Sequence, residues 1–192
     1  AYENLGFPEQ AYVRYQDSVT KYPEAYDSFT ALTRLLNAGQ NVDQYQAGLV
    51  NYYAKKYGAA ADAFSKYLFN TNNPNLDAYY FRAQSYLGAD EPEKAIGDLK
   101  NLINTAPESA HWSDAWFESA YIHWAYLDNF TTGAQTLLDF VSKYPQHQDA
   151  PKALFNAGRI YDRGQYPTLA ADTWARVINE YPMDPSAPRA FL

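Results

Sequence analysis

The sequence of 192 residues contains no cysteine, and this absence removes several kinds of chemistry. Disulfide bonds, thiolate nucleophiles and Cys-ligated zinc or iron sites all need the missing thiol. A chain without cysteine fits reducing and oxidising compartments equally, so this part of the composition leaves the localisation open.

Long hydrophobic runs and positive charge are also scarce. No stretch approaches the roughly 18 apolar residues of a membrane helix, and the opening AYENLGFPEQ lacks the basic segment and apolar core of a signal peptide. The chain has 15 basic and 22 acidic residues, a net charge of −7 and a pI near 4.9. Without a basic stripe we expect neither nucleic-acid binding nor membrane insertion.

Motifs for catalysis or metal binding are missing as well. The three histidines, His111, His123 and His147, have no metal-ligand spacing among themselves, and no HExxH sequence is present. His147 lies two residues before Asp149, a pair that a solvated loop explains better than a metal site. The chain has no G-x-S-x-G nucleophile motif and no glycine-rich phosphate loop, so we expect no cofactor and no metal.

Aromatic residues, in contrast, make up 17% of the chain, with 19 tyrosines among them. Tyrosine suits half-buried surfaces, because its ring is apolar while its hydroxyl stays wet. The apolar residues follow a helical period and nowhere sustain a period of two, which predicts an all-α fold without a sheet. About ten antiparallel helices are expected at 9–21, 24–38, 42–56, 59–70, 75–88, 92–105, 111–127, 131–144, 149–163 and 167–180.

Two segments of the chain share one spacing of small, large and proline residues. Their equivalent positions are Tyr79, Ala83, Tyr86, Ala95, Leu99 and Pro107 in the first, and Leu154, Gly158, Tyr161, Ala170, Trp174 and Pro182 in the second. Residues 44–74 and 114–145 follow the same order with small shifts. The small residues let two helices approach closely, and the proline stops the second helix.

This pattern resembles the tetratricopeptide repeat. The resemblance implies an α-α superhelix, a TPR-like solenoid. The chain would then comprise an irregular N-terminal part (1–43), four repeats (44–74, 75–107, 112–145 and 150–182) and the start of another helix (183–192). Since that last helix lacks a partner, we expect a longer parent protein.

Three stretches place tyrosine and proline after a helical pattern, namely KYPEAY from Lys21, KYPQHQ from Lys143 and EYPMDP from Glu180. We interpret them as helix-ending signals, with Tyr22, Tyr144 and Tyr181 covering the seam between repeats. Gly39 is expected to end the helix before it in a similar way.

In tetratricopeptide arrays the first helix of each pair lines a concave inner face. Carried onto this chain, the resemblance assigns that face to Tyr45, Leu49, Tyr52, Tyr53, Tyr80, Gln84, Phe117, Tyr121, Trp124, Phe155, Arg159, Asp162 and Arg163. Burial between neighbouring helices is the competing explanation for many of these rings. The face lacks the Lys and Asn pair with which chaperone-binding repeats hold acidic tails, so capture of such a tail is not expected.

The amino-acid sequence of the repeats also looks like that of the helical N-terminal region of bacterial soluble lytic transglycosylases. This resemblance implies a non-catalytic scaffold from an exported cell-wall protein, located in the periplasm or another extracytoplasmic site. Its partner would be a protein or its own downstream domain, with peptidoglycan glycan as a further candidate. Protein-interaction adaptors, periplasmic or cytoplasmic, remain the alternative. Glu118-Ser119 matches the start of the transglycosylase catalytic helix, but the glycine-rich stretch that follows in that family is absent.

Overall fold

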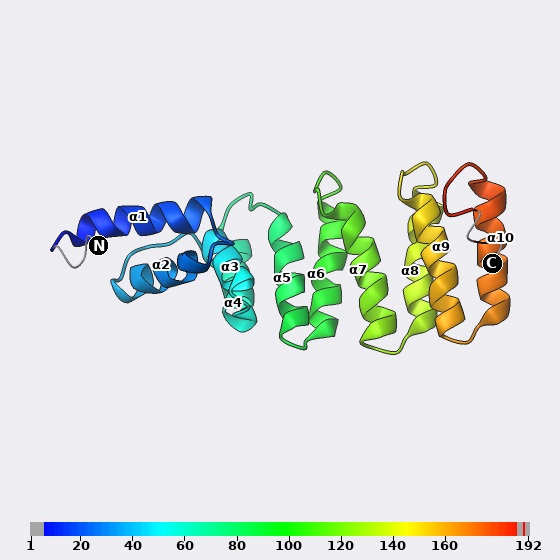
Figure 1. Ribbon diagram of the computed structural model, residues 1–192, viewed down its shortest axis with the longest axis horizontal. Helices are drawn as coiled ribbons and strands as arrows, with labels where there is room; N and C mark the ends of the chain where they lie inside the picture. The colour runs from blue at the N-terminus through cyan, green and yellow to red at the C-terminus, as the bar shows by residue number, and fades with distance from the viewer. Residues whose placement is uncertain (1–5, 188–189, 191–192) are drawn as a thin grey trace. The chain divides into compact units, whose positions relative to one another are not determined.

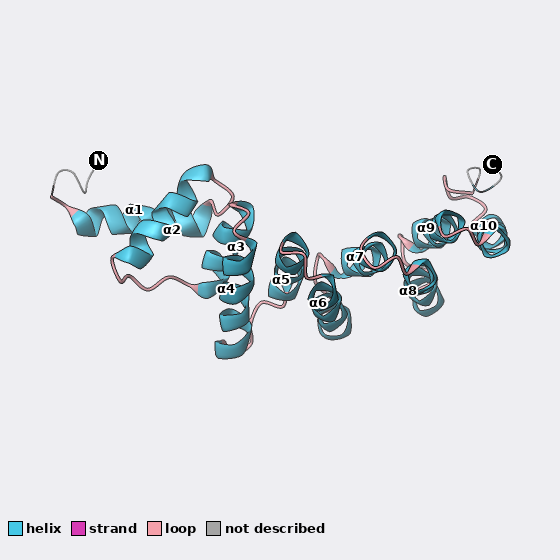
Figure 2. Ribbon diagram, turned by 90° about the horizontal axis from the view of Figure 1, so that it is seen from below, coloured by secondary structure: helices cyan, strands magenta, loops and turns pink. Residues whose placement is uncertain are grey.

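The computed structural model describes residues 6–187 and 190, and these residues form ten α-helices and no strand (Figures 1 and 2). The helices are α1 (Pro8–Lys21), α2 (Tyr26–Asn37), α3 (Gln44–Tyr53), α4 (Tyr57–Asn70), α5 (Asp77–Gly88), α6 (Pro92–Thr105), α7 (Trp112–Ala125), α8 (Phe130–Lys143), α9 (Ala150–Arg163) and α10 (Pro167–Glu180). The predicted all-α class is confirmed. None of the helices within the described residues is long and apolar enough to cross a membrane.

Helices α6 and α10 begin and end as predicted, and the ends of the other helices differ from the prediction by at most three residues, most of all in α3. The sequence predicted a helix over 42–56, whereas α3 begins after Asp43, whose carboxylate accepts the Gln46 N–H at 3.0 Å. That bond is a helix N-cap, which fixes the start of the helix. Past the other end, Lys55 has a left-handed φ of 57°, so the helix cannot continue to residue 56.

A left-handed residue recurs in the turn within each of the four helix pairs. These residues are Lys55, Asp90, Asp128 and Gln165, with φ between 53° and 62°. In the turn before α10, the Tyr166 N–H donates to the Tyr161 carbonyl at 2.9 Å, and the turns at Lys55 and Asp90 close in the same way. Such a bond across six residues reverses the chain sharply, which makes the two helices of a pair antiparallel.

The tyrosine-proline stretches end helices as predicted. Tyr22, Tyr144 and Tyr181 are the C-cap residues of α1, α8 and α10, each followed by its proline. The tyrosine carbonyl then accepts an N–H three residues on at 3.0 Å in all three loops. The Tyr181 hydroxyl donates to the Pro145 carbonyl at 2.9 Å, so this side chain does cover the seam between the last two helix pairs.

The chain divides into two compact units, residues 1–98 and 99–192, with the boundary inside α6. In the first unit α1 packs on α2, and α4 packs on both α3 and α5. In the second unit α7, α8, α9 and α10 lie side by side, each packed on the next (Figure 1). The predicted helix beyond residue 183 falls partly outside the described residues, and the chain forms turns up to Ala187.

Two glycines mark the closest helix contacts within pairs. A Cβ at Gly48 of α3 would lie 2.6 Å from the Phe64 ring of α4, and a Cβ at Gly158 of α9 would lie 2.3 Å from Nε1 of Trp174 in α10. The Trp174 indole N–H donates to the Phe155 carbonyl at 3.3 Å, which holds the ring in this place. The aromatic rings therefore occupy the space that a methyl group would need.

Replacing Gly158 with alanine tests this contact. Helix propensity alone would stabilise the chain by about 1 kcal/mol, whereas overpacking against the Trp174 ring costs about 1–3 kcal/mol. We therefore expect Gly158→Ala to lower the free energy of unfolding, measured by urea denaturation followed by circular dichroism. Gly97→Ala is the matched control, because no atom lies within 4 Å of a Cβ at that helical position, and it should be stabilising. Equal gains for both variants would contradict the packing argument.

A buried ion pair joins α5 and α6 inside the first unit. The Arg82 guanidinium donates twice to the Asp98 carboxylate, both at 2.7 Å, and once to the Ser65 hydroxyl at 3.1 Å. Only 16% of the Arg82 side chain and 5% of the Asp98 side chain are exposed. The rings of Tyr79 and Tyr86 lie 5.5 and 5.8 Å from the guanidinium carbon.

Removing one partner should cost more than removing both. Arg82→Met leaves Asp98 buried without its cation, and we expect a loss of about 3–5 kcal/mol in the free energy of unfolding. Arg82→Met combined with Asp98→Leu leaves no buried charge and should recover most of that loss. Denaturant titrations of the three proteins measure both values, and a double variant that is less stable than Arg82→Met would refute this account.

Candidate functional site

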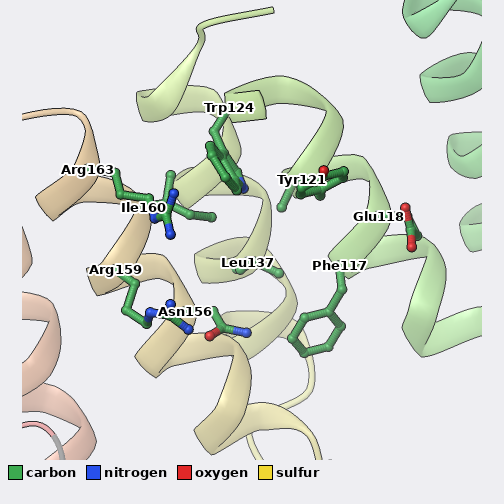
Figure 3. Close-up of a pocket in the computed structure, with 10 residues that line it drawn as sticks. Phe117, Glu118, Tyr121, Trp124, Leu137, Asn156, Arg159, Ile160 and Arg163 are labelled. Carbon is green, nitrogen blue, oxygen red and sulfur yellow. The ribbon is translucent and has the colours of Figure 1, made fainter. Parts of the chain in front are cut away.

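A pocket of about 270 Å³ opens in the second unit between α7 and α9 (Figure 3). Its lining combines aromatic side chains from α7 with polar and cationic side chains from α9. The lining residues are Phe117, Glu118, Ala120, Tyr121, Trp124, Leu137, Asn156, Arg159, Ile160 and Arg163. We call this pocket the α7–α9 groove.

The α7 wall of the groove is aromatic because Phe117, Tyr121 and Trp124 recur at helical spacing on one face. The Tyr121 and Trp124 rings meet edge to face at 5.4 Å, and Trp124 stacks on Phe130 with ring centroids 6.3 Å apart. Phe117 lies 6.2 Å from Phe140, a ring of the core. These contacts fix the ring positions, yet Tyr121 remains 44% exposed.

The α9 wall carries two arginines one helical turn apart. The guanidinium carbon of Arg163 lies 4.9 Å from the centre of the Trp124 ring, a cation–π contact across the groove. Arg159 makes no hydrogen bond or ion pair with any described residue, and Figure 3 shows both arginines reaching from α9 toward the pocket. Asn156 and Ile160 line the same wall, and buried Leu137 of α8 lies behind them.

The same face of α9 continues into a second, more open pocket of about 510 Å³. Asn156 and Arg159 line both pockets, and Lys152 and Phe155 join them on the far side. The Lys152 ammonium lies 4.7 Å from the centre of the Phe117 ring. The α9 face thus presents three cations in a row, at 152, 159 and 163.

Six of the predicted face residues lie in or beside this groove. Phe117, Tyr121, Trp124, Arg159 and Arg163 line it, and Phe155 lines the adjoining pocket. Asp162 is exposed on α9 and lines neither pocket. The sequence analysis did not predict that Glu118, Asn156 and Ile160 line the groove, because it assigned only the family's usual inner positions to the binding face. Their spacing of three or four residues from the predicted ones could have indicated them.

The predicted residues of the first unit behave differently. Leu49 is only 9% exposed and packs with Phe64 and Ala78 in the core, so its assignment to a binding face is corrected. The Tyr52 ring packs at 5.6 Å on Phe81, between α3 and α5. On this helix Leu49 is thus fully covered by neighbouring side chains and Tyr52 is covered in part.

The other predicted residues of the first unit are scattered. Tyr45 packs at 5.8 Å on Phe64, and burial raises the pKa of its hydroxyl to about 12. Tyr53 is 45% exposed and lines a separate pocket of about 480 Å³ between α2 and α3. Tyr80 and Gln84 are half-buried on α5.

The groove contains little that could carry out a reaction. Glu118 is its single acidic lining residue, and the two arginines line the opposite wall. Within the described part of the chain, no group of three His, Asp or Glu side chains could hold a metal ion. An exposed aromatic wall beside cationic side chains is a composition common at binding surfaces.

Comparisons with known proteins agree with this architecture. Residues 152–182, which include most of α9 and all of α10, match the family described as tetratricopeptide repeat. The solved structure of YrrB, described as a TPR protein with an unusual peptide-binding site, matches with a TM-score of 0.60 and 18% identity. The match covers 100% of this chain and 97% of YrrB. A comparison with curated protein sequences gave no match.

At this level of identity the likeness to YrrB shows the fold. The predicted all-α, TPR-like solenoid fold is therefore confirmed. The family match itself rests on the last of the four predicted repeats.

Two tyrosines, Tyr121 of α7 and Tyr52 of α3, provide a comparison between a groove ring and a ring packed between helices. Tyr121→Ala should lower the free energy of unfolding by less than about 1 kcal/mol, because Tyr121 is 44% exposed and lies outside the core. Tyr52→Ala removes a ring packed between α3 and α5, and it should cost about 3 kcal/mol. Thermal and urea unfolding of both variants measure the difference. Similar losses would show that Tyr121 is also a core residue.

Proposed function

We propose that the chain is a non-catalytic binding module that holds an extended peptide segment of a partner protein in the α7–α9 groove. The single observation that carries this proposal is the open aromatic wall of α7 beside the unpaired Arg159. Apolar rings that stay exposed next to polar anchors are the common composition of protein-binding hot spots.

The size of the groove supports a peptide ligand. Pockets for small molecules and cofactors usually enclose about 300–1,000 Å³, and this groove lies just below that range at about 270 Å³. One or two side chains of an extended segment would fill it. The adjoining pocket along α9 gives the segment a path to continue.

Comparison of equivalent repeat positions explains why the groove is open here. In the shared spacing Phe81 of α5 corresponds to Asn156 of α9, and Tyr52 of α3 corresponds to Trp124 of α7. The Phe81 ring covers Tyr52 at 5.6 Å. Asn156 is a shorter polar side chain, so the space that Phe81 fills in the first unit remains free beside Trp124.

A catalytic role for Glu118 receives little support from the geometry. Glycoside cleavage generally uses two carboxyl groups on opposite sides of the scissile bond. The groove lining offers one, and Figure 3 shows it turned to the far side from Arg159. Binding without turnover is the activity that this lining favours.

We also propose a context for the chain in its parent protein. The similarity of the repeat sequences to those of lytic transglycosylases supports a helical region of an exported protein of that type, in the periplasm or another extracytoplasmic site. Its partner would be its own downstream domain or a glycan. A protein-interaction adaptor fits the same fold. A full-length sequence with an export signal and a lysozyme-like domain would favour the first, and a full-length protein without them would favour the adaptor.

Asn156→Phe tests the groove directly. The new ring should fill the space beside Trp124, as Phe81 fills it beside Tyr52, so binding of peptides selected from a random library should fall at least about tenfold, or 1.4 kcal/mol. Stability should be unchanged or slightly higher, because apolar surface becomes buried.

Calorimetric titration of a selected peptide into the wild type and the variant measures the effect. Lys66→Phe on α4, at an exposed position outside the groove, is the control for an added ring. Unchanged affinity in a folded Asn156→Phe protein would place the binding site elsewhere.

A further inference from the structure

We propose that the α7–α9 groove selects peptides by a carboxylate, which Arg159 and Arg163 bind while an adjacent large apolar side chain packs on Trp124 and Tyr121. The ligand is thus an acidic peptide segment with an Asp or Glu side chain next to an apolar residue. This inference rests on the proposed peptide-binding function and names the class of peptide.

The cations of the groove differ from other cations of the chain in having no acidic partner in the part of the chain that the structure describes. The chain has 22 acidic against 15 basic residues, so a typical cation has carboxylates available within its own chain. Arg176 of α10, for example, donates to Glu180 at 2.7 Å, and Arg82 is fully paired with Asp98. On the groove face of α9, in contrast, Lys152, Arg159 and Arg163 pair with no carboxylate among the described residues.

Nearby acids do not neutralise these cations. Asp162 is adjacent to Arg163 and three residues after Arg159, yet it makes no ion pair with either. Glu118 lies on the other wall of the groove. Asp184 lines the adjoining pocket beside Lys152 and Arg159, but its carboxylate accepts hydrogen bonds from Ser186 and forms no ion pair with a described residue. The positive edge of the groove is therefore available to a ligand, and attraction to an acidic segment would also speed its approach.

The placement of Arg163 prepares it for a carboxylate. A guanidinium stacked on an aromatic face keeps its N–H groups at the edge, where they can donate in pairs to one carboxylate. The contact with Trp124 at 4.9 Å holds the side chain near the groove before a ligand arrives. Less side-chain freedom is then lost on binding than for a solvated arginine.

The two walls also fix where each part of the ligand goes. The α7 wall bears rings and the acidic Glu118, so it favours an apolar side chain and disfavours a second carboxylate. Arg159 and Arg163 lie one turn apart on α9, where one carboxylate, or two neighbouring ones, can reach both guanidinium groups. Lys152 continues the positive edge past Phe117.

This arrangement differs from the chaperone-tail recognition that the sequence excluded. That recognition depends on a Lys and Asn pair at set positions of the inner face, and those positions are mainly aromatic here. The cations of the α7–α9 groove come from one helix and lie beside the Trp124 indole ring. Peptide specificity would accordingly depend on the apolar residue of the peptide as much as on its carboxylate.

A library of random ten-residue peptides with amidated C-termini, displayed on an array, provides the first test with the full chain. Wild-type protein should enrich peptides in which Asp or Glu lies within two residues of Phe, Leu, Ile, Met or Trp. A parallel array with free C-termini tests the competing source of the carboxylate: enrichment there alone would assign the arginines to the chain end and would overturn the side-chain assignment.

Variants then connect the selectivity to the arginines. For an enriched peptide against its Gln or Asn isostere, wild-type affinity should differ by about tenfold or more per bound arginine. Arg159→Gln combined with Arg163→Gln should erase that ratio and its salt dependence, while affinity for the neutral isostere stays the same. Arg176→Gln on α10 is the control that removes one charge outside the groove.

The outcomes distinguish this inference from the proposed function. If peptides bind in the groove but acidic residues are not enriched, carboxylate selection is wrong and peptide binding stands. If the double variant keeps the acidic preference, other residues supply it and this assignment fails. If no peptide on either array binds, both proposals fail. Circular dichroism of each variant confirms that it is folded before its binding is compared.

Discussion

The close approach of two helices at a small residue is the contact on which the rest of this structure depends. Gly48 against Phe64 and Gly158 against Trp174 leave no room for a methyl group. At the equivalent places Ala83 and Ala120 are 1% exposed. Because the helices of a pair meet there, the large side chains of each helix have only two places to go, the next pair or the inner face. The inner face of each pair is therefore a consequence of how its two helices touch.

The turns between helices determine the direction of each helix and therefore which of its faces points toward the next pair. A left-handed residue reverses the chain within each pair, and a proline directly after the C-cap residue follows α8 and α10, the second helices of the last two pairs. Neither turn needs glycine, since Lys, Asp and Gln adopt the left-handed conformation at a modest cost. A residue other than glycine adopts this conformation in the equivalent turn of all four pairs. Phe117, Tyr121 and Trp124 consequently share one side of α7, opposite Arg159 and Arg163 on α9.

Much of this arrangement could be predicted from the sequence because repeats report their own spacing. The proline positions located helix ends, and the small residues located the contacts within pairs. The same frame could not predict that Leu49 is buried or that Tyr52 is covered, because each depends on the neighbouring pair. The ring that covers Tyr52 belongs to Phe81, which lies 29 residues away in the sequence. Periodicity identifies a face, but the side chain that covers it comes from another helix.

The pairing of charges was equally hidden from sequence spacing. Arg159 has Asp162 three residues away, a spacing that often gives an ion pair on a helix, and yet the two remain apart. Arg82 has no acid at such a spacing on its own helix, and it finds Asp98 on α6. The first arginine is thus left on an open face and the second is buried in a core. Two arginines on the first helices of different pairs thus have opposite environments, because α6 supplies a carboxylate to Arg82 and no described residue supplies one to Arg159.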